Sequence, residues 1–118
     1  YRRLIEQAGL TELLLPQERP GCRHVFHLYV IRCPGRDALS NWLIKKGIGV
    51  QIAYPLALPH QPALAFLGYR GGQFPQAERA AAEVLSLPLY PEITPEQLQA
   101  VVQARHQALR KPAAQKTG

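Results

Sequence analysis

Strand-like and helix-like segments alternate along most of this chain, and this alternation limits it to few folds. Segments rich in β-branched, aromatic or alternating apolar residues predict strands at residues 25–32, 48–54 and 87–89. Segments with apolar residues on one helical face predict helices at residues 37–46, 75–85 and 95–111. This order predicts an α+β domain, in which a small sheet of about three strands is covered by helices. A sheet this small leaves one face or edge for a partner.

The last helix has the strongest local start signal. Thr94 is suited to the N-cap, Pro95 to the first helical position, and Gln97 to the third position of a capping box. In the helix predicted at residues 37–46, Asp37 lies near the positive end of the dipole and Gly47 follows as the stop. Both helices are therefore bounded by residues that favour helix ends.

Composition argues against two classes of partner. The net charge of +6 is spread over the whole chain of 118 residues rather than gathered in one patch, which argues against nucleic-acid binding. No apolar run approaches the roughly 18 residues of a membrane-spanning helix, so we expect no membrane association. The two cysteines, Cys22 and Cys33, flank an extended segment too long for a disulfide, which predicts free thiols in a reducing compartment.

A zinc site is the alternative interpretation of Cys22, His24, His27 and Cys33. Successive residues of a strand point to opposite faces, so Cys22 and His24 would diverge from His27 and Cys33. We therefore predict no metal site. His27 is expected to be a hydrogen-bonded residue of the core or of an interface.

The segment after the second predicted strand carries polar side chains on a proline-rich loop. Tyr54 ends the strand, and His60 and Gln61 follow among several prolines. Such a loop can present binding groups at low entropic cost, or it can be a structural turn. The residues alone leave both interpretations open.

Several short motifs together resemble one family. They are His27–Arg32, Arg36–Leu39, Gly47-Ile48, Tyr54-Pro55, Gln61–Ala63, Leu67–Tyr69, Phe74–Glu78 and Leu85–Pro91. In this combination they resemble the C-terminal small domain of the DegT/DnrJ-type nucleotide-sugar aminotransferases, which depend on pyridoxal phosphate (PLP). These enzymes have the aspartate aminotransferase-like fold, type I.

The resemblance implies a domain plan. Residues 1–21 would be the connecting helix and linker from a missing N-terminal large domain, residues 22–112 the small domain, and residues 113–118 a flexible tail. The full-length protein would be a cytoplasmic homodimer.

The resemblance also implies a reaction. An amino group, usually from glutamate, would be transferred to a keto group on a nucleotide-linked sugar, for amino sugars of cell-surface polysaccharides or antibiotics. The family holds PLP as a Schiff base on a lysine of the large domain. The lysines here lie in no comparable context, so we expect the chain alone to be inactive and to bind no PLP; they are Lys45, Lys46, Lys111 and Lys116.

Two positions depart from the family pattern. Ala53 stands where a histidine commonly precedes the Tyr-Pro pair, and Pro59 occupies the usual histidine position, with His60 one step later. The implied contacts to the substrate are Tyr54, His60 and Gln61, and no catalytic residue is expected in the chain. Two alternatives remain: a free-standing, non-catalytic binding module with this fold, and a related dehydratase in which histidine replaces the lysine.

Overall fold

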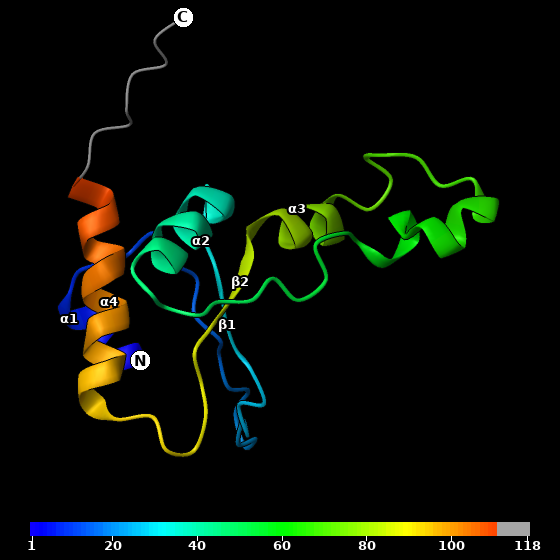
Figure 1. Ribbon diagram of the computed structural model, residues 1–118. Coiled ribbons are helices and arrows are strands. Elements are labelled where there is room, and N and C mark those ends of the chain that lie inside the picture. The colour runs from blue at the N-terminus through cyan, green and yellow to red at the C-terminus, as the bar shows by residue number, and fades with distance from the viewer. Residues whose placement is uncertain (111–118) are drawn as a thin grey trace, which may run out of the picture.

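The computed structural model describes the backbone of residues 1–110 and the side chains of residues 1–108 (Figure 1). The elements are α1 (Arg2–Gln7), β1 (Tyr29–Arg32), α2 (Arg36–Lys45), the 3-10 helices η1 (Leu58–His60) and η2 (Pro62–Leu67), α3 (Pro75–Glu83), β2 (Val84–Leu87) and α4 (Pro95–Arg110). The α+β class is therefore confirmed. The predicted tail at residues 113–118 lies outside the described residues.

The sheet has two paired strands at its centre. β1 and β2 are antiparallel, from the pair Tyr29–Leu87 to the pair Arg32–Val84. Leu14 adds to the outer edge of β1 through two hydrogen bonds with Arg32, of 2.9 and 3.0 Å. Gln51 adds to the outer edge of β2 through bonds of 3.2 and 2.8 Å with Ser86. The sheet is thus widened on each side by a single residue, and the three-stranded sheet is not formed.

The first strand begins later than predicted. Val25 is 88% exposed, and Phe26 has a φ of 47°, which no strand residue adopts. The Phe26 N–H donates to His24 Nδ1 at 2.8 Å, and the two rings stack at 4.2 Å. This local bond competes with strand pairing. The prediction of a strand over residues 25–28 is therefore wrong, and His27, expected within it, is exposed.

In the alternating segment at residues 48–54, three of the four side chains predicted to be buried face the core, whereas Tyr54 is 81% exposed and no continuous strand forms. Ile48, Val50 and Ile52 pack against the core, as the alternation predicts. Only Gln51 pairs with a strand, because Tyr54 adopts a φ of 61° and turns the chain away. Alternation reports which side chains are buried, and it does not require a continuous hydrogen-bonded ladder.

The third predicted strand begins earlier than expected. Val84 and Leu85 fit the apolar face of a helix, yet they open β2 directly after α3. Arg36 fixes this junction, since its Nη1 donates to Ala81 O at 3.1 Å and to Val84 O at 2.9 Å. Leu89, predicted to lie in the strand, falls beyond β2 and is 36% exposed.

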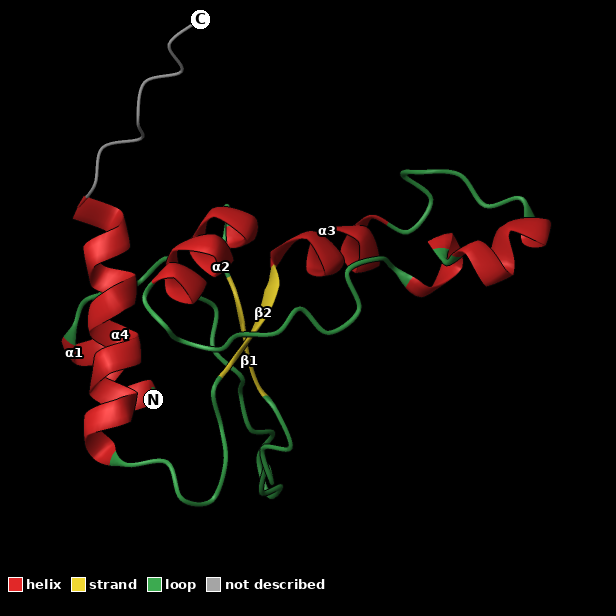
Figure 2. Cartoon of the chain, in the orientation of Figure 1, coloured by secondary structure: helices red, strands yellow, loops and turns green. Residues whose placement is uncertain are grey.

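The core lies between the sheet and three helices. α1, α2 and α4 gather on one side of β1 and β2 (Figures 1 and 2). The largest fully buried side chains come from the sheet, its continuation and α2: Ile31, Cys33, Leu43 and Leu85. Trp42 Nε1 donates to Ala104 O at 2.8 Å and so joins α2 to α4. We call the two-stranded sheet together with α1, α2 and α4 the body. Burial of these apolar groups is the main contribution to its stability.

The capping box of α4 forms as predicted. The Gln97 N–H donates to Thr94 Oγ1 at 3.2 Å, and the Thr94 N–H donates to Gln97 Oε1 at 2.9 Å. Tyr90 also donates its hydroxyl to Gln97 Oε1 at 2.9 Å, which ties the preceding loop to the helix start.

Replacing Thr94 by alanine is expected to lower the free energy of unfolding by about 1 kcal/mol, because the Gln97 N–H loses its acceptor. Urea denaturation of the chain measures this loss. Thr11, an exposed threonine outside the helices, provides the control Thr11→Ala, with an expected change below about 0.5 kcal/mol. Equal losses in the two variants would contradict a capping role.

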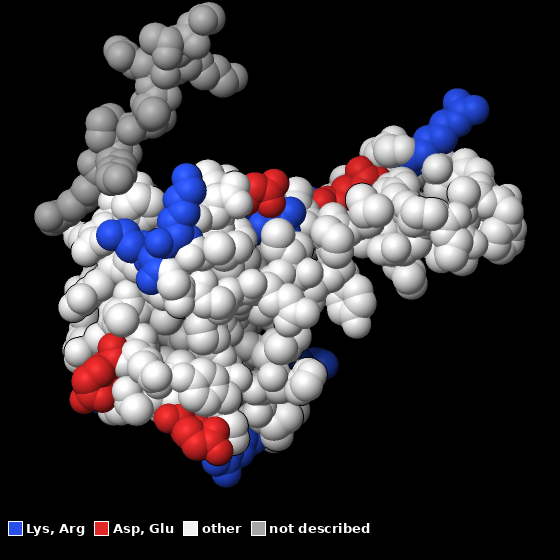
Figure 3. Space-filling model, in the orientation of Figure 1, with Lys and Arg blue, Asp and Glu red and all other residues white. Residues whose placement is uncertain are grey.

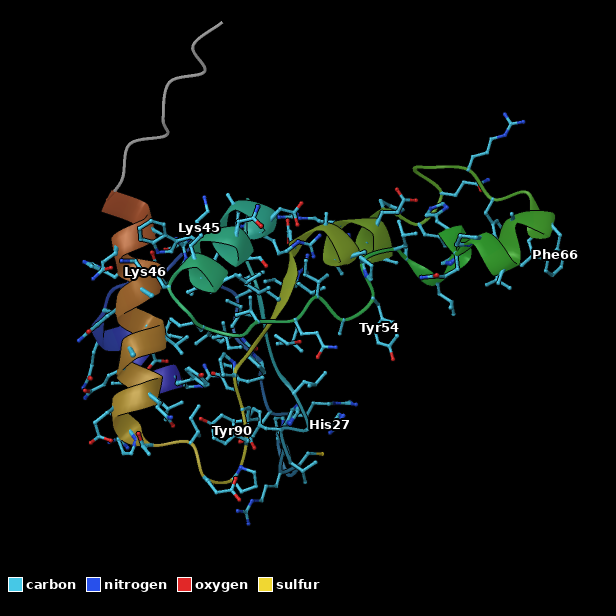
Figure 4. The ribbon with its side chains drawn as sticks, in the orientation of Figure 1. His27, Lys45, Lys46, Tyr54, Phe66 and Tyr90 are labelled. Carbon is cyan, nitrogen blue, oxygen red and sulfur yellow. The ribbon has the colours of Figure 1, made fainter. Side chains whose placement is uncertain are left out.

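One part of the chain leaves the body. We call residues 54–83, which include η1, η2 and α3, the arm; it extends away from the sheet, and Phe66 lies near its far end (Figures 1 and 4). On the face seen in Figure 3 it carries few charges. Its large apolar side chains are unusually exposed: Tyr54 81%, Leu56 47%, Leu58 73%, Phe66 81%, Leu67 48% and Tyr69 46%. An exposed apolar row of this kind is typical of a surface that meets a partner.

Candidate functional site

The arm begins at a residue in an uncommon backbone conformation. Tyr54 and Phe26 are the non-glycine residues with a positive φ in the described part of the chain, and that of Tyr54 is 61°. This region costs an L-residue about 1–2 kcal/mol. The Tyr54 side chain is 81% exposed and points away from the body (Figure 4). A strained, exposed aromatic residue is a candidate for a ligand contact.

Three groups of the arm meet at one carboxylate, that of Glu78. His60 Nε2 lies 2.8 Å from Glu78 Oε1, across the gap between η1 and α3. The Gly72 N–H lies 2.9 Å from each Glu78 oxygen, and the Phe74 N–H donates to Oε1 at 3.2 Å. We call His60, Gly72, Phe74 and Glu78 the arm clasp. It joins the two halves of the arm.

Aromatic rings support the clasp. The His60 ring meets Phe74 edge-on, with centroids 6.3 Å apart, and Phe74 meets Tyr69 edge-on at 5.0 Å. Such arrangements are favoured between aromatic rings. His60 is thus held by one polar and one aromatic neighbour.

Gln61 is bound within the arm as well. Its Nε2 donates to Leu56 O at 3.3 Å, and the residue is half-buried. Of the three predicted contact residues, His60 and Gln61 therefore lie together at the junction of η1 and η2, whereas Tyr54 lies at the start of the arm. All three lie on the arm.

The residue that sequence reasoning missed is Glu78. It lies within the Phe74–Glu78 motif, but nothing in the motif indicates which groups it binds. The available signal was a carboxylate in the first turn of a helix, where free N–H groups attract negative charge. The glycine-rich turn before the helix supplies a further N–H group through Gly72.

The arm clasp keeps Glu78 ionised. Hydrogen bonding from His60, and then from the Gly72 and Phe74 N–H groups, lowers the pKa of Glu78 below its ordinary value of 4.5. The folded pKa is therefore lower than the unfolded one. Such a group stabilises the fold above the unfolded pKa, and this stabilisation is lost as the pH falls through the folded pKa.

Acidification is accordingly expected to loosen the clasp at a pH below about 4.5. Amide hydrogen exchange at Gly72 and Phe74 measures this, and protection should fall as Glu78 becomes protonated. Glu78→Gln should remove the pH step, whereas Glu92→Gln, at an exposed position outside the arm, should keep it. Identical pH dependence in all three proteins would refute the role of Glu78.

The described lysines lie apart from the arm. Lys45 and Lys46 are exposed at the end of α2, on a side of the molecule away from Tyr54 (Figure 4). Lys46 Nζ lies 5.0 Å from the centroid of the Trp42 ring, on the outside of the body. Lys111 and Lys116 lie outside the described residues. No step of PLP chemistry can therefore be assigned to the described lysines.

The other candidate groups do not form a site. Residues 1–110 hold no group of three His, Cys, Asp or Glu placed to bind a metal ion. Cys22 is exposed and Cys33 buried, both as free thiols, and burial raises the pKa of Cys33. None of the helices in this range is long and apolar enough to cross a bilayer. The basic side chains form separate groups on the face drawn in Figure 3.

A hollow next to the sheet offers a second contact surface. It has a volume of about 550 Å³, and its lining includes Arg2, Leu14, Val30, Arg32 and Val84. Val30, Arg32 and Val84 alternate with the core-facing residues of β1 and β2, so they belong to the sheet face opposite the core. This face is open to packing by another domain.

Two curated proteins illustrate what the sequence is similar to. The "Pleiotropic regulatory protein" of Geobacillus stearothermophilus is 50% identical over 103 residues, which are 87% of this chain and 28% of that protein. The dTDP-3-amino-3,4,6-trideoxy-alpha-D-glucose transaminase of Micromonospora megalomicea is 37% identical over 94 residues, which are 78% of this chain and 25% of that protein. The chain thus spans about a quarter of the length of these relatives.

Solved structures agree with the fold. DesV from S. venezuelae matches with a TM-score of 0.85 and 31% identity, over 95% of this chain and 30% of that chain. NtdA from Bacillus subtilis, solved with bound cofactor PMP, matches with a TM-score of 0.70 and 25% identity, over 93% of this chain and 26% of that chain. The helices, the narrow sheet and the arm therefore form an arrangement found within larger proteins.

A family model also matches most of the chain. The model of the DegT/DnrJ/EryC1/StrS aminotransferases covers residues 1–105, which include the body, the arm and most of α4. The motifs from His27 to Pro91 all fall within that range. On this match and on the relatives, the chain belongs to the DegT/DnrJ/EryC1/StrS aminotransferase family.

Proposed function

We propose that this chain is the C-terminal small domain of a PLP-dependent aminotransferase that acts on a keto group of a nucleotide-linked sugar. The observation that carries the proposal is the family match over residues 1–105, together with the sugar transaminase of Micromonospora megalomicea among the relatives. Bound PLP serves as the electron sink when an amino group is exchanged for a keto group. The lysine that holds it lies in an N-terminal large domain, and the isolated chain is inactive and binds no PLP.

In this proposal the arm supplies contacts to the sugar. Tyr54 offers an exposed hydroxyl, and His60 and Gln61 offer polar groups on a rigid, proline-rich loop. A sugar is recognised through its hydroxyls, so groups that both donate and accept hydrogen bonds suit it. These residues bind and orient the substrate.

The exposed surfaces support the proposed partners. The apolar row of the arm and the open face of the sheet are suited to a large domain preceding residues 1–21 and to a second subunit of a cytoplasmic homodimer. In this plan residues 22–112 form the small domain, and residues 113–118 follow it as a tail.

A second candidate is a non-catalytic module that retains this fold. The observation in its favour is the name of the Geobacillus stearothermophilus relative, a pleiotropic regulatory protein. The departures at Ala53 and Pro59 also lie beside the proposed sugar contacts. A related dehydratase would differ from a transaminase in the residue of the large domain that stands at the position of the PLP-binding lysine.

The test uses the full-length protein with PLP, L-glutamate and a panel of dTDP- and UDP-linked keto sugars. Mass spectrometry should detect an amino sugar with at least one of them. The 118-residue chain under the same conditions should give none. Failure of the full-length protein on the whole panel, with intact cofactor binding, would favour the second candidate or the dehydratase.

Replacing Tyr54 by phenylalanine is expected to raise the KM for the sugar about tenfold, the equivalent of one lost hydrogen bond. Steady-state kinetics of the full-length protein measure this. Tyr69→Phe is the matched control, because Tyr69 lies on the same arm and contacts Phe74 through its ring. An unchanged KM in Tyr54→Phe would show that the Tyr54 hydroxyl does not contact the substrate.

A further inference from the structure

In the arm clasp, one side chain, that of Glu78, forms hydrogen bonds with three separate parts of the arm. Glu78 Oε1 lies within 2.8 Å of His60 Nε2, 2.9 Å of the Gly72 nitrogen and 3.2 Å of the Phe74 nitrogen. Its Oε2 lies 2.9 Å from the same Gly72 nitrogen. The carboxylate therefore joins η1, the glycine turn and the start of α3, which are separate segments of the arm.

We propose that Glu78 is a positioning residue, which holds His60 by Nε2 so that Nδ1 of the ring is turned toward the nucleotide-linked sugar. This inference rests on the proposed function, since it assigns a role within the same substrate loop. Glu78 itself contacts no substrate. It acts through the orientation of His60.

The hydrogen bond determines which nitrogen of His60 remains for a ligand. A carboxylate only accepts, so Nε2 must carry the proton that lies between the two residues. None of the hydrogen bonds among the described side chains uses Nδ1 of His60. Nδ1 then accepts a hydrogen bond when the ring is neutral and donates one when the ring is protonated. A sugar hydroxyl can serve as partner in either state.

Packing fixes the ring in the same orientation. Phe74 meets the imidazole edge-on, and Tyr69 in turn meets Phe74 at 5.0 Å. The His60 side chain is 21% exposed and that of Glu78 is 27% exposed, so their bond is partly shielded from water. A partly shielded bond to a charged group is stronger than a fully solvated one. Glu78 can therefore restrain the loop without help from the body.

The same helix contains a control for the loss of a negative charge from α3. Glu83 binds Arg32 Nη2 at 2.8 Å and Arg79 Nε at 2.9 Å, at the root of the arm, and it touches none of the clasp residues. Glu78→Gln and Glu83→Gln remove one negative charge each from α3. Only the first removes the carboxylate from the clasp.

Kinetics of the full-length protein test the inference by separating the two half-reactions. The half-reaction with glutamate does not involve the sugar, whereas the second half-reaction does. Glu78→Gln should lower kcat/KM of the sugar half-reaction about tenfold, mainly through KM, and leave the glutamate half-reaction unchanged. Glu83→Gln should leave both unchanged. An equal loss in both half-reactions, or no difference between the variants, would overturn the inference.

Nuclear magnetic resonance of the chain itself gives a readout independent of activity. Glu78→Gln should shift the Gly72 and Phe74 amide resonances and move the Nε2 proton resonance of His60 upfield, because an amide oxygen is a weaker acceptor than a carboxylate. His60→Gln can still donate to Glu78, so the Gly72 resonance should stay in place while the sugar half-reaction is impaired. Unshifted Gly72 and Phe74 resonances in Glu78→Gln would contradict the inference.

The proposed function and the positioning role of Glu78 are contradicted by different results. Absence of amino transfer to every sugar by the wild-type full-length protein contradicts the proposed function, and with it the substrate role of His60. Normal amino transfer combined with a Glu78→Gln variant that matches Glu83→Gln contradicts only the positioning role of Glu78.

Discussion

Replacing Leu43 by alanine is expected to lower the free energy of unfolding by about 3–4 kcal/mol. Leu43 is 0% exposed and belongs to the core cluster in which α2 packs against α4 and the sheet. Removing its branched end leaves a cavity that the surrounding helices can fill only in part. The loss thus combines lost apolar transfer energy with lost packing.

Urea denaturation of the chain measures this effect, and the next residue provides the control. Ile44 lies on the same helix but is 56% exposed, so Ile44→Ala should cost less than about 1 kcal/mol. Equal losses at the two positions would mean that the α2–α4 contact does not form the core.

Replacing Arg36 by methionine is expected to lower the free energy of unfolding by about 3 kcal/mol. Arg36 is 6% exposed, and its Nη1 donates to the carbonyls of Ala81 and Val84 at 3.1 and 2.9 Å. Methionine fills much of the same space but cannot donate, so acceptors at the α3–β2 junction lose their partner. Unsatisfied acceptors at a buried junction each cost about 1–3 kcal/mol.

Thermal and urea unfolding compare this variant with two others. Arg79→Met removes an exposed arginine that pairs with Glu83, and it should cost less than about 1 kcal/mol. Arg36→Lys keeps the charge but not the planar fork, so its stability should lie between wild type and Arg36→Met. A loss in Arg36→Met no larger than in Arg79→Met would show that the junction does not depend on Arg36.

The helices were predictable from sequence because their signals are local. The exchange of hydrogen bonds between Thr94 and Gln97 involves neighbouring residues only, and the structure contains it. The strands were less predictable, because a strand exists only where a second segment pairs with it. Val84 and Leu85 fit a helical stripe, but their pairing with β1 and the bonds from Arg36 place them in β2.

The candidate site was predictable only in part, because some of its signals are local in the sequence and others depend on tertiary structure. Tyr54 could be selected from a proline-rich loop after an alternating segment, and the structure places it exposed at the start of the arm. The role of Glu78 could not be predicted, because His60 and Gly72 approach it only when the arm folds back on itself. Its hydrogen bonds are a property of tertiary structure.

In the proposed function, catalysis is divided between two parts of one polypeptide. The body of this chain is a scaffold, and the arm carries the proposed sugar contacts on a segment with exposed apolar side chains. The proposed large domain supplies the lysine and the cofactor.

The most direct test of this division is to find the lysine that carries the cofactor. The full-length protein is incubated with PLP, reduced with borohydride, digested and mapped by mass spectrometry. The expected result is one modified lysine, located outside these 118 residues. Specific modification of Lys45, Lys46, Lys111 or Lys116, or of no lysine at all, would contradict it.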